Sequence, residues 1–332
     1  MADALQAEGV EVTFIGGGRA EARLVPAAGF PLHAITVEGV SRRNPIRALR
    51  ALMLALAALP RARRLLARIA PDAVMGGGGY VAGPVGLAAL TLRIPLVLTE
   101  ADSHLGLTNR LLAPFARSVC LAFPLPGRDG GRYLVTGRPI HAGASDRASA
   151  REHFGIEPGE TCVLVFGGSL GARSINLAAV EAFAGAPFRV LHVCGRRDHP
   201  ELAARSLRAG YDLHEYLHMS DFEAALAAAD LVVARAGGSV FEIAAHGLPA
   251  VLVPYPHAAG DHQKRNATWM ADAGAAIVVE DEELTAGRLG GEVAALLADP
   301  GRMAAMATAA HRLARPDAAG EVARQLLRAA AG

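Results

Sequence analysis

The sequence has few charged residues, few aromatic residues and only three cysteines in 332 positions. Charged residues make up 20% of the chain and the formal net charge is +1, which excludes a global electrostatic field for nucleic acid. Cys120, Cys162 and Cys194 are odd in number, widely spaced and set in apolar runs. This usage argues for free thiols in a reducing compartment and against a disulfide or zinc framework. Any electrostatic partner must therefore be attracted by a local patch.

Long hydrophobic runs and an evident secretory signal are also missing. The longest uncharged apolar run near the front, Ala51 to Ala58, is far too short to span a bilayer. Apolar residues still make up 52% of the chain, which is ample for buried cores. The length suggests two domains.

Short apolar runs alternate with helical stretches along the whole chain, and glycine or proline follows most of the runs. Near-continuous Val, Leu and Ile is typical of parallel strands covered on both faces. The pattern predicts an α/β fold with two Rossmann-like, doubly wound domains facing a cleft, where ligands bind beyond the carboxyl ends of the strands. The expected strands are residues 10–15, 73–75, 96–99, 118–122, 132–135, 161–166, 189–194, 231–234, 250–253 and 276–279.

The best domain boundary is the segment Gly137-Arg138-Pro139-Ile140-His141, because proline there breaks regular structure. We expect a first domain over residues 1–138 and a second over 142–310. Residues 311–332 should form a C-terminal helix that packs back on the first domain.

The front of the chain departs from the usual order of a Rossmann-type domain, which opens with a strand, a glycine loop and a helix. Residues 1–9 instead read as a helix that ends at Gly9 and leads into the strand at 10–15. The missing strand is normally central, so its absence would leave unpaired backbone groups inside the sheet. We therefore expect the first strand and its loop to be encoded before Met1. A domain that simply begins with a helix is the alternative.

A glycine-rich turn, Gly167-Gly-Ser169-Leu-Gly171-Ala-Arg173, follows the strand at 161–166 and opens a helix. Small residues let a phosphate approach the backbone, the helix N-terminus offers free N–H groups, and Ser169 can add a hydroxyl donor. The spacing matches neither the dinucleotide motif G-x-G-x-x-G nor a P-loop. A plain strand-to-helix turn is the alternative.

The most informative stretch runs from Arg235 to Asn266. A second turn, Arg235-Ala-Gly237-Gly238-Ser239, follows the strand at 231–234 and leads into a helix with Glu242 in its first turn. A carboxylate at this position can accept hydrogen bonds from two ribose hydroxyls, or it can merely stabilise the helix dipole.

A polar loop follows the next strand, at 250–253. Asp261, Gln263 and Asn266 supply the donors and acceptors that recognition of sugar hydroxyls requires. With the two glycine turns, they predict a nucleotide-sugar site. His257, His262 and Asp261 could instead form a metal cluster, although their spacing matches no familiar site, and a solvated loop is the third interpretation.

Two loops in the first half could also carry function. Gly76-Gly77-Gly78-Gly79-Tyr80 permits positive φ or a close approach of the backbone, although a flexible loop with no ligand is a fair rival. Glu100, Asp102 and His104 follow the strand at 96–99 and are candidate acid/base or hydroxyl-binding groups. Asp102 could equally begin a helix as its cap.

Residues 41–70 contain eight arginines, no acid and an apolar stretch between the basic positions. A basic amphipathic segment of this kind suits an anionic membrane surface, where each basic residue contributes about 1 kcal/mol. A solvated helix face with a core stripe is the alternative. The arginines are Arg42, Arg43, Arg47, Arg50, Arg61, Arg63, Arg64 and Arg68.

Together these motifs resemble the MurG family, the peptidoglycan glycosyltransferases of GT-B fold, over essentially the whole chain. The matching pieces are residues 76–84, 106–110, 167–173, 242–249 and 254–266. The resemblance implies an inverting transfer of GlcNAc from UDP-GlcNAc to the muramyl sugar of lipid I, which forms lipid II at the cytoplasmic face of the cell membrane. It implies no cofactor, no bound metal and no nucleic acid, and other cell-wall synthesis proteins as partners.

The resemblance also implies roles for individual residues. In the donor half, Ser169 and the turn Gly237, Gly238 and Ser239 would meet the diphosphate, Glu242 the ribose and the backbone around Met219 the uracil. Gln263 would contact GlcNAc, with Asp261 and Asn266 nearby. In the acceptor half, Gly76 to Gly79 would face the lipid diphosphate, and Tyr80 and Asn109 would also bind the acceptor.

Three departures from the family pattern bear on activity. The glycine loop with the histidine proposed as base would precede Met1, and Asp102 replaces the usual asparagine. His141 stands where the family has an arginine, and Arg138 could take its place on the donor. Glu100 and Asp102 are then the remaining candidates for the base, and we expect the chain to bind UDP-GlcNAc but to transfer it poorly. A UDP-GlcNAc epimerase of related fold and a UDP-sugar-binding module are the alternatives.

Overall fold

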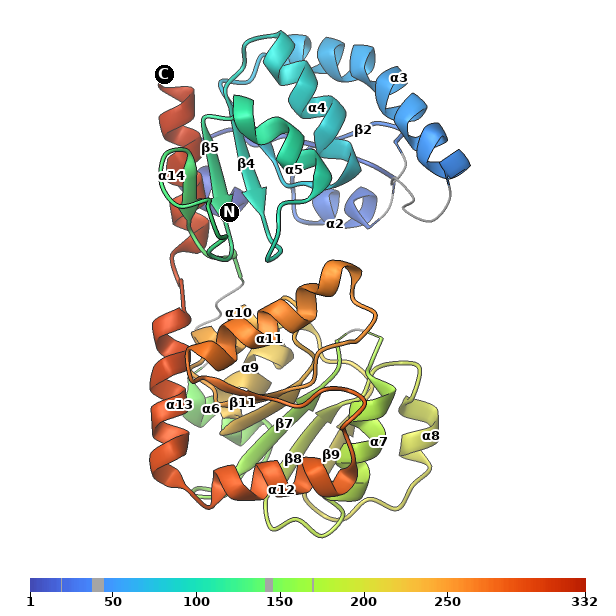
Figure 1. Cartoon of the computed structure of the whole chain (residues 1–332), viewed down its shortest axis with the longest axis vertical. Helices are drawn as coiled ribbons and strands as arrows, with labels where there is room; N and C mark the ends of the chain where they lie inside the picture. The colour runs from blue at the N-terminus through green and yellow to red at the C-terminus, as the bar shows by residue number, and fades with distance from the viewer. Residues whose placement is uncertain (19, 38–44, 141–145, 169) are drawn as a thin grey trace. The chain divides into compact units, whose positions relative to one another are not determined.

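The computed structural model describes residues 1–18, 20–37, 45–140, 146–168 and 170–332 (Figure 1). The chain divides into two compact units. The first comprises Met1–Pro139 together with Asp317–Gly332, and the second comprises Ile140–Pro316. All ladders between the named strands of both units are parallel.

The second unit contains one six-stranded sheet in the order β12-β11-β10-β7-β8-β9. The chain builds outward from β7 in one direction and from β10 in the other, so the strand order reverses between these two strands. In doubly wound folds this reversal opens a crevice at the carboxyl edge, where ligands bind. The strands are β7 (Cys162–Phe166), β8 (Arg189–Val193), β9 (Tyr211–His214), β10 (Leu231–Ala234), β11 (Ala250–Leu252) and β12 (Ala276–Val278).

Helices cover both faces of this sheet (Figure 1). Val163 and Val165 of β7 belong to a core that includes residues of α7 and α12, whereas the Phe166 ring packs on Phe222 of α9 with ring centroids 5.1 Å apart. Neighbouring strand residues thus face opposite layers, as the pleat requires. The helices are α6 (Arg147–His153), α7 (Arg173–Ala182), α8 (His199–Ala203), α9 (Met219–Ala228), α10 (Val240–Ala245), α11 (His262–Asp272), α12 (Ala286–Leu297) and α13 (Pro300–Leu313), with the short 3₁₀ turn η2 (Ala259–Asp261).

The first unit contains two separate sheets, β1-β2 and β3-β4-β5-β6. Among the described residues no ladder joins β1 to β3, and the strand expected before Met1 stays a prediction. The strands are β1 (Phe14–Gly16), β2 (Leu32–Ala34), β3 (Val74–Gly76), β4 (Leu96–Glu100), β5 (Ser118–Leu121) and β6 (Tyr133–Val135).

Alternation along β4 assigns the two faces of the larger sheet. Leu96 and Leu98 pack in a core with residues of α3 and α4, whereas Val97 packs with Leu5 of α1 and Val322 of α14. Figure 1 shows α14 beside β4 and β5. The helices of this unit are α1 (Ala2–Ala7), α2 (Glu21–Ala27), α3 (Pro45–Ile69), α4 (Gly79–Thr91), α5 (Leu107–Leu112) and α14 (Ala318–Ala330), with the 3₁₀ turn η1 (Ala113–Phe115).

The predicted fold class is confirmed, with differences at particular elements. β1 begins at Phe14 rather than at residue 10, and the edge strands β2 and β9 were not predicted because both are short and carry polar residues. The chain passes from the second unit to the first after Pro316.

No helix among the described residues combines the length and apolar character needed to cross a membrane.

Candidate functional site

Two glycine loops meet at the carboxyl edge of the second sheet. A Cβ atom on Gly171 would overlap the carbonyl of Cys194, and one on Gly195 would overlap the backbone of Gly171. Both glycines also have positive φ, +77° and +81°. Only glycine therefore lets the turn after β7 lie against the loop after β8. Ser169, the hydroxyl predicted in this turn, lies outside the described residues.

A buried polar network fixes these two loops from below. Asn176 of α7 donates from Nδ2 to the Cys194 carbonyl and to Asp198, each at 2.8 Å, and its Oδ1 lies 3.0 Å from His192 Nε2. His192 Nδ1 lies 2.8 Å from the Tyr211 hydroxyl. Burial lowers the pKa of His192 to about 3, so the ring is neutral. This network was not predicted, although Asn176 within the apolar run 175–180 and His192 within 190–194 were the available signal.

Arg235, directly after β10, is a second brace. The residue is only 9% exposed and its Nη1 lies 2.6 Å from Asp281 Oδ1. The same nitrogen donates to the carbonyls of Val253 and Pro254, and Nη2 donates to Ser174 Oγ at 2.8 Å. The guanidinium therefore ties together the loops after β10, β11 and β12 and the start of α7. Its charge is already paired, so it acts as a structural clamp.

Residues of α11 hold the turn at Gly237. Asn266, 3% exposed, donates from Nδ2 to the carbonyls of Ala236 and Gly237 at 3.0 and 3.4 Å. Gln263 Oε1 accepts from the Tyr255 backbone N–H at 3.0 Å. These two amides, predicted as sugar contacts, thus shape the loops that surround the predicted site. Asp261, which precedes α11, is exposed and has φ of +53°.

The other predicted donor residues lie along the same sheet edge. Gly237, Gly238 and Ser239 form the half-buried turn after β10, and Glu242 is half-buried in the first turn of α10. Met219, the first residue of α9, is 61% exposed. The structure therefore places these residues at the loops where a doubly wound sheet binds ligands.

In the first unit, the glycine loop after β3 contacts the first turn of α5. Gly78 and Gly79 both have positive φ, and a Cβ on Gly78 would lie 3.3 Å from Asn109 Nδ2. Thr108 Oγ1 donates to the Gly79 carbonyl at 2.8 Å. Gly76, Gly77 and Tyr80 belong to the same strand-to-helix connection. The structure brings this loop and Asn109 together, and their binding of the acceptor stays a prediction.

Glu100, 8% exposed, has both carboxylate oxygens occupied. Oε2 accepts from the Gly106 backbone N–H at 2.8 Å and from Asn109 Nδ2 at 3.0 Å, and Oε1 accepts from the Asp102 backbone N–H at 3.2 Å. This geometry orders the loop after β4. The Asp102 side chain is exposed, and His104 is half-buried.

Three further predictions concern the boundary and the basic segment. Arg138 is half-buried, and His141 lies outside the described residues, as do Arg42 and Arg43.

Among residues that the structure describes, no group of three or more His, Cys, Asp or Glu side chains could hold a metal ion.

Comparison with known proteins gives two domain matches from one family. The N-terminal domain of glycosyltransferase family 28 matches residues 1–121, and the C-terminal domain of that family matches residues 162–322. A Moorella thermoacetica protein named UDP-N-acetylglucosamine–N-acetylmuramyl-(pentapeptide) pyrophosphoryl-undecaprenol N-acetylglucosamine transferase is 44% identical over 93% of this chain and 88% of its own length. The protein of the same name from Rubrobacter xylanophilus is 42% identical over 99% of this chain and 98% of its own.

Solved structures extend the comparison. The crystal structure of Acinetobacter baumannii MurG has a TM-score of 0.80 at 32% identity, covering 98% of this chain and 94% of that one. A UDP-GlcNAc 2-epimerase from Neisseria meningitidis has a TM-score of 0.62 at 14% identity, covering 96% of this chain and 100% of that one. The second likeness shows a shared fold alone.

Proposed function

Because the chain belongs to glycosyltransferase family 28 and, within it, to the MurG family, we infer that it transfers GlcNAc from UDP-GlcNAc to the muramyl sugar of lipid I and so forms lipid II. The strongest support for this function is the likeness of the chain to relatives named for this transfer, which extends over nearly their whole length. The loops at the carboxyl edge of the second unit support this proposal, because ligands of doubly wound sheets bind at that edge.

The donor would bind along this edge. Glu242, in the first turn of α10, would accept hydrogen bonds from two ribose hydroxyls. The backbone groups at the exposed start of α9, at Met219, would bind the uracil ring. The turns at Gly168 and Gly237 present backbone N–H groups to the diphosphate, which gains charge as UDP leaves. Fixed dipoles aimed at developing charge are usually the largest catalytic term in such sites. The brace at Arg235 keeps these dipoles in place.

The acceptor would bind at the glycine loop of the first unit, Gly76 to Gly79. Because both oxygens of Glu100 are hydrogen-bonded, we assign it the positioning of this loop through Asn109. Asp102 carries an exposed carboxylate on the loop after β4 and is the better candidate to take the acceptor proton.

Peripheral membrane binding would use α3. Leu49, Met53 and Leu56 are each more than half exposed and follow one another at i, i+4 and i+7, so they share one face of the helix. Ala62 and Leu66 are buried on another face. An exposed apolar stripe beside arginines suits insertion into an anionic membrane surface.

Turnover of UDP-GlcNAc with a lipid I analogue tests the function. Glu242→Gln should lower kcat/KM about ten- to hundredfold through the donor, because a charge-assisted hydrogen-bond pair is lost. Glu181→Gln, an exposed carboxylate on α7, is the matched control and should change little. Conversion of UDP-GlcNAc to its 2-epimer without transfer to the acceptor would refute the proposal and favour the epimerase.

A further inference from the structure

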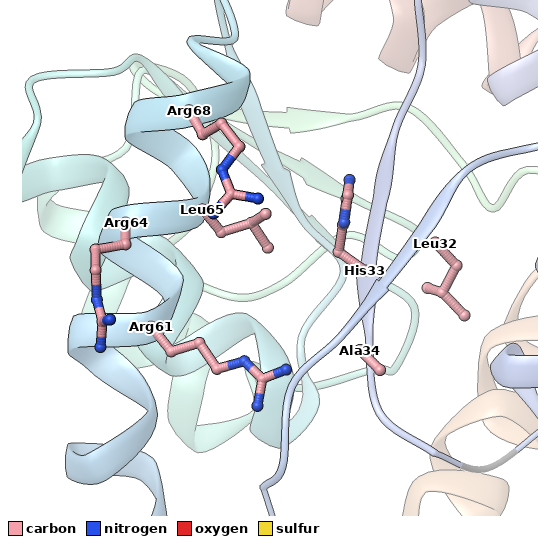
Figure 2. Close-up of a pocket in the computed structure, with 7 residues that line it drawn as sticks. All are labelled: Leu32, His33, Ala34, Arg61, Arg64, Leu65 and Arg68. Carbon is pink, nitrogen blue, oxygen red and sulfur yellow. The ribbon is translucent and has the colours of Figure 1, made fainter.

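The first unit contains a pocket between α3 and β2, away from the loops discussed above (Figure 2). Its volume is about 480 Å³. Figure 2 shows Arg61 and Arg68 extending from α3 toward β2, with Leu65 between them and His33 on the side of β2 that faces the helix. The lining residues are Leu32, His33, Ala34, Arg61, Arg64, Leu65 and Arg68.

The positive charge of this pocket has no partner within the described part of the chain. Arg61, Arg64 and Arg68 form no ion pair there, and residues 41–70 contain no acid. Arg61 and Arg68 occupy positions i and i+7 on one face of α3, so their like charges repel one another. Arg64 extends to the other side of the helix in Figure 2 and donates from Nε to the Pro60 carbonyl at 3.3 Å. Arg63, by contrast, turns away and donates to Thr91 Oγ1 at 2.8 Å. An anion between α3 and β2 would relieve this repulsion.

We propose that this pocket binds the phosphate of an anionic phospholipid headgroup, one lipid per chain. Arginine suits phosphate because its planar guanidinium donates two parallel hydrogen bonds. Arg61 and Arg68 are about 10 Å apart along the helix axis at 1.5 Å per residue, which leaves room for a headgroup between them. Leu65 offers an apolar floor to the glycerol and the first acyl carbons.

The choice of a lipid over a soluble phosphate rests on the membrane surface proposed above. Leu49, Met53 and Leu56 lie on the same helix as the pocket arginines, so a bilayer that meets this stripe would bring headgroups to the pocket. The phosphate chemistry rests on the pocket alone. A discrete site also differs from diffuse attraction, because it depends on shape as well as on charge.

Two variants of the full chain separate shape from charge. Leu65→Trp fills the pocket and keeps every charge, and Leu65 is half-buried, so the helix should accept the larger ring. Arg61→Gln with Arg68→Gln removes two pocket charges. The matched control is Arg63→Gln with Arg93→Gln, which removes two exposed charges of the same unit outside the pocket. Unfolding midpoints check that each variant is folded.

Calorimetry with dihexanoyl phosphatidylglycerol below its micelle concentration measures the site, with dihexanoyl phosphatidylcholine and inorganic pyrophosphate as comparison ligands. We expect one phosphatidylglycerol per chain, at least about tenfold weaker binding in both pocket variants, and a change within about twofold in the control. The site would be overturned if the pocket-charge variant and the control lost the same affinity for phosphatidylglycerol while Leu65→Trp bound it unchanged. Pocket-dependent binding of pyrophosphate without phosphatidylglycerol would overturn the lipid assignment.

Vesicles distinguish failure of the pocket from failure of the membrane surface. Met53→Ser should weaken cosedimentation with phosphatidylcholine vesicles containing phosphatidylglycerol, yet leave binding of the short-chain lipid unchanged. Loss of short-chain lipid binding in Met53→Ser would contradict a separate pocket.

Discussion

The two units fix the loops at their carboxyl sheet edges by different means. In the second unit, Asn176, His192 and Arg235 are buried and hold four loops through side chains from several elements. In the first unit, Glu100 does most of this alone, through hydrogen bonds within ten residues of the chain. Loops held by long-range buried contacts should open only with the unit, whereas a loop held by one local carboxylate can rearrange by itself.

This difference suits the chemistry proposed for each unit. A diphosphate leaving group needs dipoles that are already in place when charge develops, and the second unit supplies a rigid frame for them. The acceptor is a large amphiphile, and a locally held loop can adjust to admit it. Variants that remove each brace in turn test whether the contrast is real.

Removing the Arg235 clamp should have the largest effect. Arg235→Met leaves Asp281 without its ion pair in a mostly buried setting, and breaking such a pair typically costs about 3–5 kcal/mol. Urea unfolding followed by fluorescence reads this unit alone, because the only tryptophan of the chain is Trp269 in α11. Arg235→Met with Asp281→Asn should recover part of the loss, and Arg302→Met, at an exposed position of α13, should change stability little. A loss below about 1 kcal/mol in Arg235→Met would contradict the clamp.

The Arg235 clamp also illustrates what sequence can and cannot predict. Strands, glycine turns and the placement of Glu242 follow from local patterns, and the structure has them near the expected residues. The pairing of Arg235 with Asp281 joins residues far apart in sequence and leaves no local signature. For the same reason the roles of Asn266 and Gln263 as loop braces were not foreseen, since an amide that contacts sugar and one that holds a carbonyl look alike in a sequence.

Removing the Glu100 brace should have the next largest effect and should also separate positioning from proton transfer. Glu100→Gln loses the charge of an acceptor with three N–H partners, which should destabilise the first unit by about 2 kcal/mol. If Glu100 only positions the loop, Glu100→Gln should lower kcat together with the stability of the unit. Asp102→Asn, the comparison variant, should lower kcat about a hundredfold or more with little loss of stability, because a proton acceptor is removed. A large loss of kcat in Glu100→Gln with an unchanged kcat in Asp102→Asn would reverse the two roles.

Acid should weaken the second unit through His192. Its folded pKa of about 3 lies below the ordinary value of 6.5, so at mildly acidic pH the unfolded chain binds a proton that the folded chain does not. The resulting loss in the free energy of unfolding is absent above pH 6.5 and grows by about 1.4 kcal/mol per pH unit as the pH falls toward 3. The free energy of unfolding, followed by Trp269 fluorescence, should therefore fall as the pH is lowered from 6.5 to 5. In His192→Gln its slope against pH should be smaller by the equivalent of about one bound proton. Equal slopes in both proteins would show that His192 protonates without opening the network.

The smallest effect on stability should come from glycines that the fold itself does not require. Gly237 and Gly77 both lack positive φ, and a Cβ on Gly237 would meet nothing within 4 Å, while one on Gly77 would lie 3.8 Å from Thr99 Oγ1. Alanine at either position should change stability by no more than about 0.5 kcal/mol. A methyl group there still blocks a ligand that approaches the backbone. Gly237→Ala should therefore raise the KM for UDP-GlcNAc and leave the acceptor KM unchanged, whereas Gly77→Ala should do the reverse. If both substitutions affected the same substrate, donor and acceptor could not be divided between the two units.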